Sequence, residues 1–202
     1  MILDPRTAPA TEVYRFMISV IVPRPIAFVS TVGANGRFNV SPFSYFNAIS
    51  SEPPLVGIAI SRREGEPKDT LRNIRTVGDF VVNVVDEPLT ERMVRTSGEW
   101  PADVDEFGIT GLTPQPSDLV KAPRVAESPV SLECRLFREI ELGNSVFVVG
   151  EVVRGHVRDD VLTDGRVDPA KLRPVGRLGG DAYAPLREVV RIARPKVPQS
   201  GA

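Results

Sequence analysis

Residues 130–158 read VSLECRLFREIELGNSVFVVGEVVRGHVR and give the clearest indication of the fold. Apolar and polar residues alternate over residues 130–142, with Arg138 as the one interruption, and this period of two predicts a β-strand with one face in a core. Gly143-Asn144 is typical of a tight turn, and residues 146–158 return as the partner strand. The stretch therefore predicts a long antiparallel hairpin.

The alternation also assigns side chains to the two faces of this hairpin. Cys134 points inward with the apolar set of the first strand, which predicts a small core residue rather than a nucleophile. In the returning strand, one face carries Phe147, Val149, Val153 and Val157. His156 lies on the opposite, polar face, beside Arg154 and Arg158.

Shorter strands and a few helices precede the hairpin. We expect strands at residues 26–32, 37–40, 45–49, 55–60 and 80–85, and helices at residues 11–20, 69–76 and 89–96. Thr11 and Asp69 are the expected N-caps of the first two helices. Residues 98–123 form a long loop that contains Trp100.

Strands that lack regular intervening helices predict a mainly β fold. We expect a mostly antiparallel β-barrel with inserted helices rather than a doubly wound sheet. No internal repeat is visible, so we expect a single domain over residues 1–202, with its core at about 12–184 and a C-terminal tail at 185–202.

Composition excludes several classes of function. The 202 residues carry a formal net charge of −1, which gives no general attraction to nucleic acid or to an anionic membrane. Cys134 and His156 are the only residues of their types, so multi-cysteine and His-rich metal sites are ruled out and we expect no metal. GxxxxGK[ST] and GxSxG are absent, and no GxGxxG follows a strand.

Neither a signal peptide nor an apolar run of membrane-spanning length is visible, so we expect a cytoplasmic protein.

The best candidate for a phosphate site is Lys68-Asp69-Thr70. A helix that begins here presents free backbone N–H groups and a positive dipole end, with a lysine and a threonine hydroxyl beside them. Arg62 and Arg63, at the end of the preceding strand, could reach the same place. The alternative is an ordinary capped helix with a solvated lysine.

Residues 41–51, SPFSYFNAISS, form a second candidate. Three aromatic residues, four serines and Asn47 gather ahead of Pro53-Pro54. Asn47 and the backbone of Ala48 and Ile49 could pair with the edge of a planar heterocycle. The alternative is that the aromatic side chains are core and the polar ones face water.

His156 is the third candidate. It is the single histidine of the chain and lies on the polar face of the returning strand. The alternative is a histidine that is simply solvated, as on the polar face of many strands.

The ordered motifs together resemble the flavin reductase-like family, and more narrowly its flavoredoxin-type branch. The resemblance covers about residues 12–184. It is carried by RPIAFVST (24–31), NVSPFSYFN (39–47), PPLV (53–56), KDTLRNI (68–74), FVVN (80–83), ESPV (127–130), GEVV (150–153) ahead of His156, and RLGG (177–180) before Tyr183.

The resemblance implies an FMN-binding split β-barrel that forms a homodimer, with FMN at the interface. It implies that Ser44, Phe46, Asn47, Ala48, Ile49 and Ser50 line the flavin ring and its ribityl chain. The resemblance further implies that the phosphate is held by Lys68, Asp69 and Thr70. Thr31 and Arg62 are expected to join them from neighbouring strands. His156 matches a histidine near the face where the electron donor approaches, which makes it the expected catalytic residue.

The function implied is an oxidoreductase in which NADH or NADPH passes a hydride to bound FMN. The electrons then leave to a small-molecule or protein acceptor. One alternative is an electron-transfer protein of the flavoredoxin type, which a protein partner reduces. A second is a ligand-binding barrel without catalysis, because a fold does not fix a function.

Overall fold

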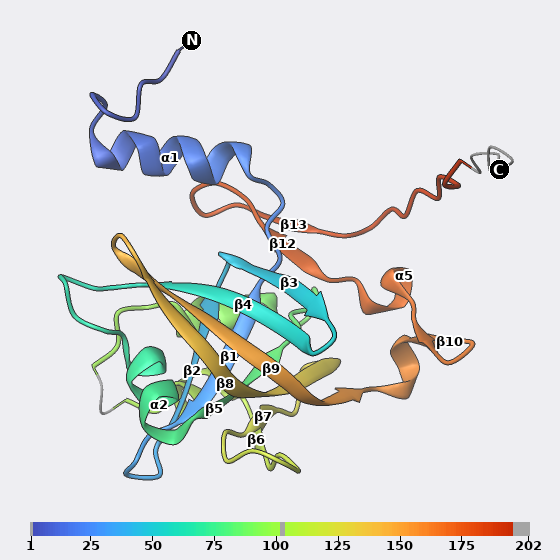
Figure 1. The fold of residues 1–202 in the computed structure, drawn as a ribbon. Coiled ribbons are helices and arrows are strands. Elements are labelled where there is room, and N and C mark those ends of the chain that lie inside the picture. Colours follow the sequence, from blue (N-terminus) through green and yellow to red (C-terminus); the bar gives the residue numbers. More distant parts are fainter. Residues whose placement is uncertain (1, 102–103, 196–202) are drawn as a thin grey trace, which may run out of the picture.

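A seven-stranded sheet with strand order β2-β1-β5-β8-β9-β4-β3 forms the body of the molecule in the computed structural model, which describes residues 2–101 and 104–195 (Figure 1). All neighbouring pairs are antiparallel. The strands are β1 (Ala27–Val32), β2 (Phe38–Phe43), β3 (Phe46–Ser51), β4 (Pro54–Ser61), β5 (Asp79–Asn83), β8 (Val130–Leu142) and β9 (Ser145–Val157). The mainly β, antiparallel fold that the sequence predicts is confirmed.

The hairpin of β8 and β9 is confirmed, but the face assigned to part of β9 is wrong. Val146, Val148 and Val152 face the core, rather than Phe147 and Val149. The pairing then skips a residue, because Glu133 pairs with Arg154 and Cys134 with Val152, which makes Val153 a β-bulge. A bulge shifts the alternation by one position, and no local feature of the sequence marks it.

Two apolar clusters lie on opposite sides of the central strands. Ala27 and Val29 belong to a cluster with Phe43, Ile58 and Phe80, whereas Phe28 on the same strand packs in the other cluster. Strand β1 is thus buried on both faces, which explains why residues 26–32 read as a nearly continuous apolar run. Cys134 is fully buried in the first cluster, as predicted.

Three helices occupy predicted regions, whereas the helix at 106–110 lies within the predicted loop 98–123 and the helix at 169–172 has no predicted counterpart. The helices are α1 (Ala10–Val20), α2 (Asp69–Val77), α3 (Thr90–Thr96), α4 (Glu106–Thr110) and α5 (Pro169–Leu172), with a 3₁₀ turn η1 (Asp159–Val161). Helix α1 begins one residue earlier than predicted, with Pro9 rather than Thr11 at the N-cap. None of its residues is buried, and Figure 1 shows it beyond β12 and β13, away from the barrel. No helix in the described ranges is long and apolar enough to span a membrane.

Three short two-stranded ribbons complete the chain. They are β6 (Pro114–Gln115) with β7 (Arg124–Val125), β10 (Leu162–Thr163) with β11 (Arg166–Val167), and β12 (Val175–Arg177) with β13 (Tyr183–Pro185). Residues 186–195 of the predicted tail form no helix or strand, and residues 196–202 lie outside the described part of the chain.

Candidate functional site

The start of α2 lacks a side-chain cap. Lys68 is the N-cap residue and has an extended backbone, so the prediction that Asp69 caps the helix is wrong. Asp69 is the first helical residue instead, and its carboxylate lies 2.5 Å from the Arg72 guanidinium. Because a lysine cannot accept a hydrogen bond, the backbone N–H groups of the first turn have no side-chain partner there, which leaves an anion-binding position.

Lys68 is a half-buried basic residue at the start of α2. Its Nζ lies 5.8 Å from the centre of the Phe43 ring, and within the described residues it pairs with no carboxylate. Burial lowers the pKa of the ammonium, the nearby charge of Arg63 lowers it further, and Glu99 opposes the shift. A bound anion would relieve both unfavourable effects.

Buried hydrogen bonds fix the residues behind this position. The Thr70 hydroxyl donates to Asn39 Oδ1 at 2.9 Å, and the Thr31 hydroxyl donates to the same oxygen at 3.4 Å. The Asn39 amide in turn donates to Glu106 Oε1 at 2.9 Å, and burial raises the pKa of that carboxyl. Thr31 is therefore a buried support, whereas Thr70 lines the depression at the start of α2.

These residues surround a depression of about 280 Å³, which we call the Lys68 pocket. Its lining residues are Asn39, Ser41, Arg63, Glu64, Glu66, Pro67, Lys68, Asp69, Thr70, Arg72, Thr96, Gly98, Trp100 and Glu106. The predicted Lys68, Asp69 and Thr70 thus share one pocket. Arg63 joins them, whereas Arg62 points elsewhere and pairs with Glu141 at 2.6 Å.

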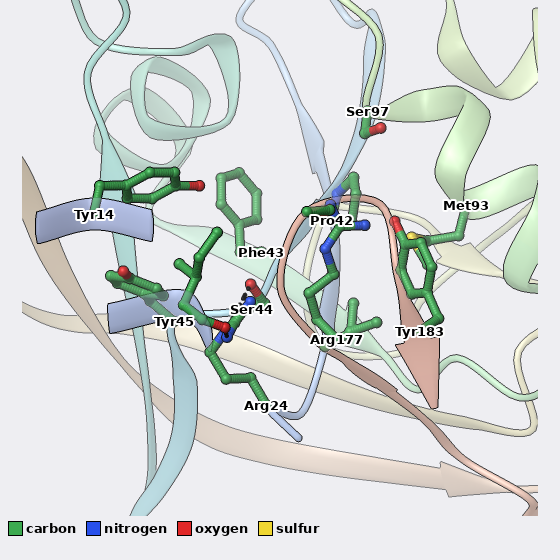
Figure 2. A pocket seen from close by; sticks show the side chains of 13 residues that line it. Tyr14, Arg24, Pro42, Phe43, Ser44, Tyr45, Met93, Ser97, Arg177 and Tyr183 are labelled. Atoms are coloured by element: carbon green, nitrogen blue, oxygen red, sulfur yellow. Dashed lines mark hydrogen bonds between the residues drawn. The ribbon is translucent and has the colours of Figure 1, made fainter. Parts of the chain in front are cut away.

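A second pocket of about 180 Å³ adjoins the first, and we call it the Arg177 pocket (Figure 2). It is lined by Tyr14, Ile18, Arg24, Ile26, Pro42, Phe43, Ser44, Tyr45, Met93, Ser97, Arg177, Gly180 and Tyr183. Ser41 and Thr96 line the Lys68 pocket, whereas the residues that follow them, Pro42 and Ser97, line the Arg177 pocket. The two pockets adjoin at Phe43, because Nζ of Lys68 in the first lies 5.8 Å from the centre of the Phe43 ring in the second.

The predicted flavin segment divides between this pocket and an exposed strand. Ser44 lines the Arg177 pocket and accepts a hydrogen bond from Arg24 Nε at 3.3 Å. Phe46 packs against the core. Asn47, Ala48 and Ile49 are exposed on β3, an edge strand, and Ser50 at the end of that segment is half-buried.

His156 lies in a different part of the barrel. Its Nε2 is 2.6 Å from Glu133 Oε1, and the buried Glu133 carboxylate also accepts the backbone N–H groups of Asp118 and Leu119. Burial raises the pKa of Glu133, but these hydrogen bonds outweigh it and the net shift is downward. Asp118 pairs with Arg154 at 2.8 Å.

Strand β9 lies between β8 and β4 in the sheet. His156 lines neither the Lys68 pocket nor the Arg177 pocket. It borders a third pocket together with Arg124, Ser128 and Arg158.

Several residues that the fold brings to the two adjoining pockets have no role predicted from the sequence. Tyr14 and Met93 come from helices far apart in the chain, and Arg177 comes from a ribbon near its end. Asn39 and Glu106 support Thr70 from a strand and a short helix. The motifs NVSPFSYFN (39–47) and RLGG (177–180) include Asn39 and Arg177, and they are the local signals for these residues.

The fold defines a class: a small protein built on an antiparallel β-barrel. The Flavin reductase like domain matches residues 19–171, and the chain belongs to this flavin-binding family. Similarity to solved flavin reductase-like structures confirms the split-barrel fold.

Relatives match over nearly the whole chain. An uncharacterized protein of Halalkalibacterium halodurans is 41% identical over 99% of both chains. The structure of nitrilotriacetate monooxygenase component B from Bacillus cereus is 34% identical, with a TM-score of 0.92, and the match covers 95% of this chain and 98% of that one. The structure of 2-nitrobenzoate 2-nitroreductase from Pseudomonas fluorescens is 32% identical over 100% of both chains, with a TM-score of 0.90. These similarities support an oxidoreductase.

Proposed function

We propose that the protein is a homodimeric, FMN-dependent oxidoreductase that takes a hydride from NADH or NADPH. The observation that carries the proposal is the unpaired Lys68 at the uncapped start of α2, in a chain of a flavin-binding family. A phosphate fits this position because it offers the charge and the hydrogen-bond acceptors that Lys68 and the first-turn N–H groups lack.

The residues around that position have separate tasks in this proposal. Lys68 supplies charge, and Thr70 supplies a backbone N–H whose position the Asn39 hydrogen bond holds. The exposed Asn47 and Ile49 of β3 would meet the ring, where a second subunit would exclude water from it. The flavin, when bound, supplies the hydride-accepting chemistry.

His156 remains the proposed residue for the approach of the electron donor. Because it lines neither the Lys68 pocket nor the Arg177 pocket of its own chain, it would reach a flavin there from the second subunit of the homodimer. The Glu133 carboxylate orients its ring through the 2.6 Å contact with Nε2. A small molecule or a protein would then accept the electrons.

The first experiment is to record the visible absorbance of the purified protein and to identify the chromophore that acid releases. Release of FMN supports the proposal. Release of FAD would correct the cofactor, and a protein that stays colourless after FMN is added would refute it. If FMN is present but neither nicotinamide nucleotide reduces it, the protein is an electron carrier that a partner reduces.

A further inference from the structure

The Arg177 pocket has an unbalanced charge. Two guanidinium groups, those of Arg24 and Arg177, line it, and none of its thirteen lining residues is acidic. The neighbouring Lys68 pocket differs, since Glu64, Glu66, Asp69 and Glu106 offset its basic residues. An anion would therefore be favoured in the Arg177 pocket by charges that its walls do not cancel.

The two arginines are not equivalent. Arg24 is 6% exposed, and its guanidinium already donates to the carbonyls of Ile18, Ile21 and Leu178 and to Ser44. Arg24 therefore forms part of the pocket wall and contributes a positive charge to it. Arg177 donates one side-chain hydrogen bond, to the Gly180 carbonyl, and within the described residues it pairs with no carboxylate.

Contacts on two sides hold Arg177 in place. Its backbone exchanges hydrogen bonds of 2.9 and 2.8 Å with Arg24. Its guanidinium lies 4.3 Å from the centre of the Tyr183 ring. Stacking of this kind fixes the plane of the guanidinium and leaves N–H groups at its edge for a carboxylate.

The rest of the pocket suits an aromatic ring. Figure 2 shows Tyr14 and Tyr45 on one side, with Arg177, Tyr183 and Met93 on the other. The volume of about 180 Å³ slightly exceeds that of an engineered cavity of about 150 Å³ that takes benzene. One six-membered ring with a small substituent fits this volume.

We propose that the Arg177 pocket binds a small aromatic carboxylate, with the carboxylate on the edge of Arg177 and the ring between the tyrosines. A planar carboxylate matches the fork of a guanidinium, and the apolar and aromatic walls favour the ring. The proposal concerns binding alone, so it holds whether or not the ligand is then reduced.

The test measures binding of benzoate to the protein as purified, by isothermal titration calorimetry. Benzamide keeps the ring and removes the charge, and cyclohexanecarboxylate keeps the charge and removes the aromatic face. We expect both to bind at least tenfold more weakly than benzoate. Equal binding of benzoate and benzamide would overturn the proposal.

Variants then locate the site. Arg177→Gln should weaken benzoate at least tenfold, Arg177→Lys should weaken it less, and Arg37→Gln, at an exposed arginine on another loop, should leave it unchanged. Unchanged affinity in Arg177→Gln would overturn the assignment.

The visible absorbance of each variant is read in parallel: if Arg177→Gln loses flavin together with benzoate affinity, the pocket belongs to the flavin and the proposal fails. A protein without flavin that still binds benzoate through Arg177 would refute the proposed function and support this site.

Discussion

Replacing Lys68 by alanine tests the proposed phosphate site most sharply. In the free protein this ammonium is half-buried against Phe43 and has no carboxylate partner among the described residues. A hydrogen bond to a charged group contributes about 1.5–3 kcal/mol. Since about 1.4 kcal/mol corresponds to a factor of ten, the dissociation constant for FMN should rise by roughly 10- to 100-fold.

The assay is a titration of flavin fluorescence with FMN and with riboflavin, which lacks the phosphate. Lys68→Ala should weaken FMN and leave riboflavin unchanged, and Lys121→Ala, at an exposed lysine, should leave both unchanged. Equal weakening of FMN and riboflavin would refute the phosphate assignment, as would an unchanged dissociation constant for FMN.

The same variant should not destabilise the free protein. Burial and Arg63 lower the pKa of Lys68, so the folded state binds this proton less tightly than the unfolded state does. Protonated Lys68 therefore opposes folding below the folded-state pKa, and stability rises as the pH increases from there towards the ordinary value of 10.5. At neutral pH, the free energy of unfolding of Lys68→Ala should equal or exceed that of the parent.

Three further predictions concern the barrel. Glu133→Gln should lower the free energy of unfolding in urea by about 1–3 kcal/mol, because an amide cannot accept all the hydrogen bonds that the carboxylate receives. The hydrogen bonds to Glu133 outweigh the effect of its burial, so its pKa is lower in the folded state than in the unfolded state. The stabilising contribution of Glu133 should therefore be present above pH 4.5 and vanish as the pH falls through the folded-state pKa. Gly150→Ala should lower the free energy of unfolding by about 1–3 kcal/mol, because a Cβ there would lie 2.3 Å from the Phe80 ring. Gly155→Ala is the control: the nearest contact of its Cβ would be 3.7 Å, so it should lower the free energy of unfolding less in the same urea series. Burial raises the pKa of Cys134 to about 12, so a thiol reagent should label the folded protein far more slowly than the urea-unfolded one, and equal rates would contradict the buried position.

Local patterns in the sequence predicted the elements that depend on local chemistry. The alternation over 130–142 and the turn at Gly143-Asn144 predicted the hairpin of β8 and β9, and the apolar run at 26–32 predicted β1. Lys68-Asp69-Thr70 lies at the start of a helix as expected, although the N-cap is Lys68, one residue before the predicted cap.

Features that depend on the assembled fold could not be predicted in this way. The bulge at Val153 has no sequence signal, because it arises where β9 bends to follow β8. Glu133 occupies a polar position of the alternation, yet residues 118 and 119 cover it and donate to it. The Arg177 pocket combines residues from both ends of the chain, and no local pattern reports such long-range contacts.

The central claim is that a reduced nicotinamide nucleotide delivers a hydride to flavin held by this chain. The most direct test mixes the FMN-loaded protein with NADH, and separately with NADPH, without oxygen in a stopped-flow spectrophotometer. The account predicts rapid loss of the visible flavin absorbance with at least one nucleotide, faster than for free FMN under the same conditions. Reduction no faster than that of free FMN with either nucleotide would contradict it.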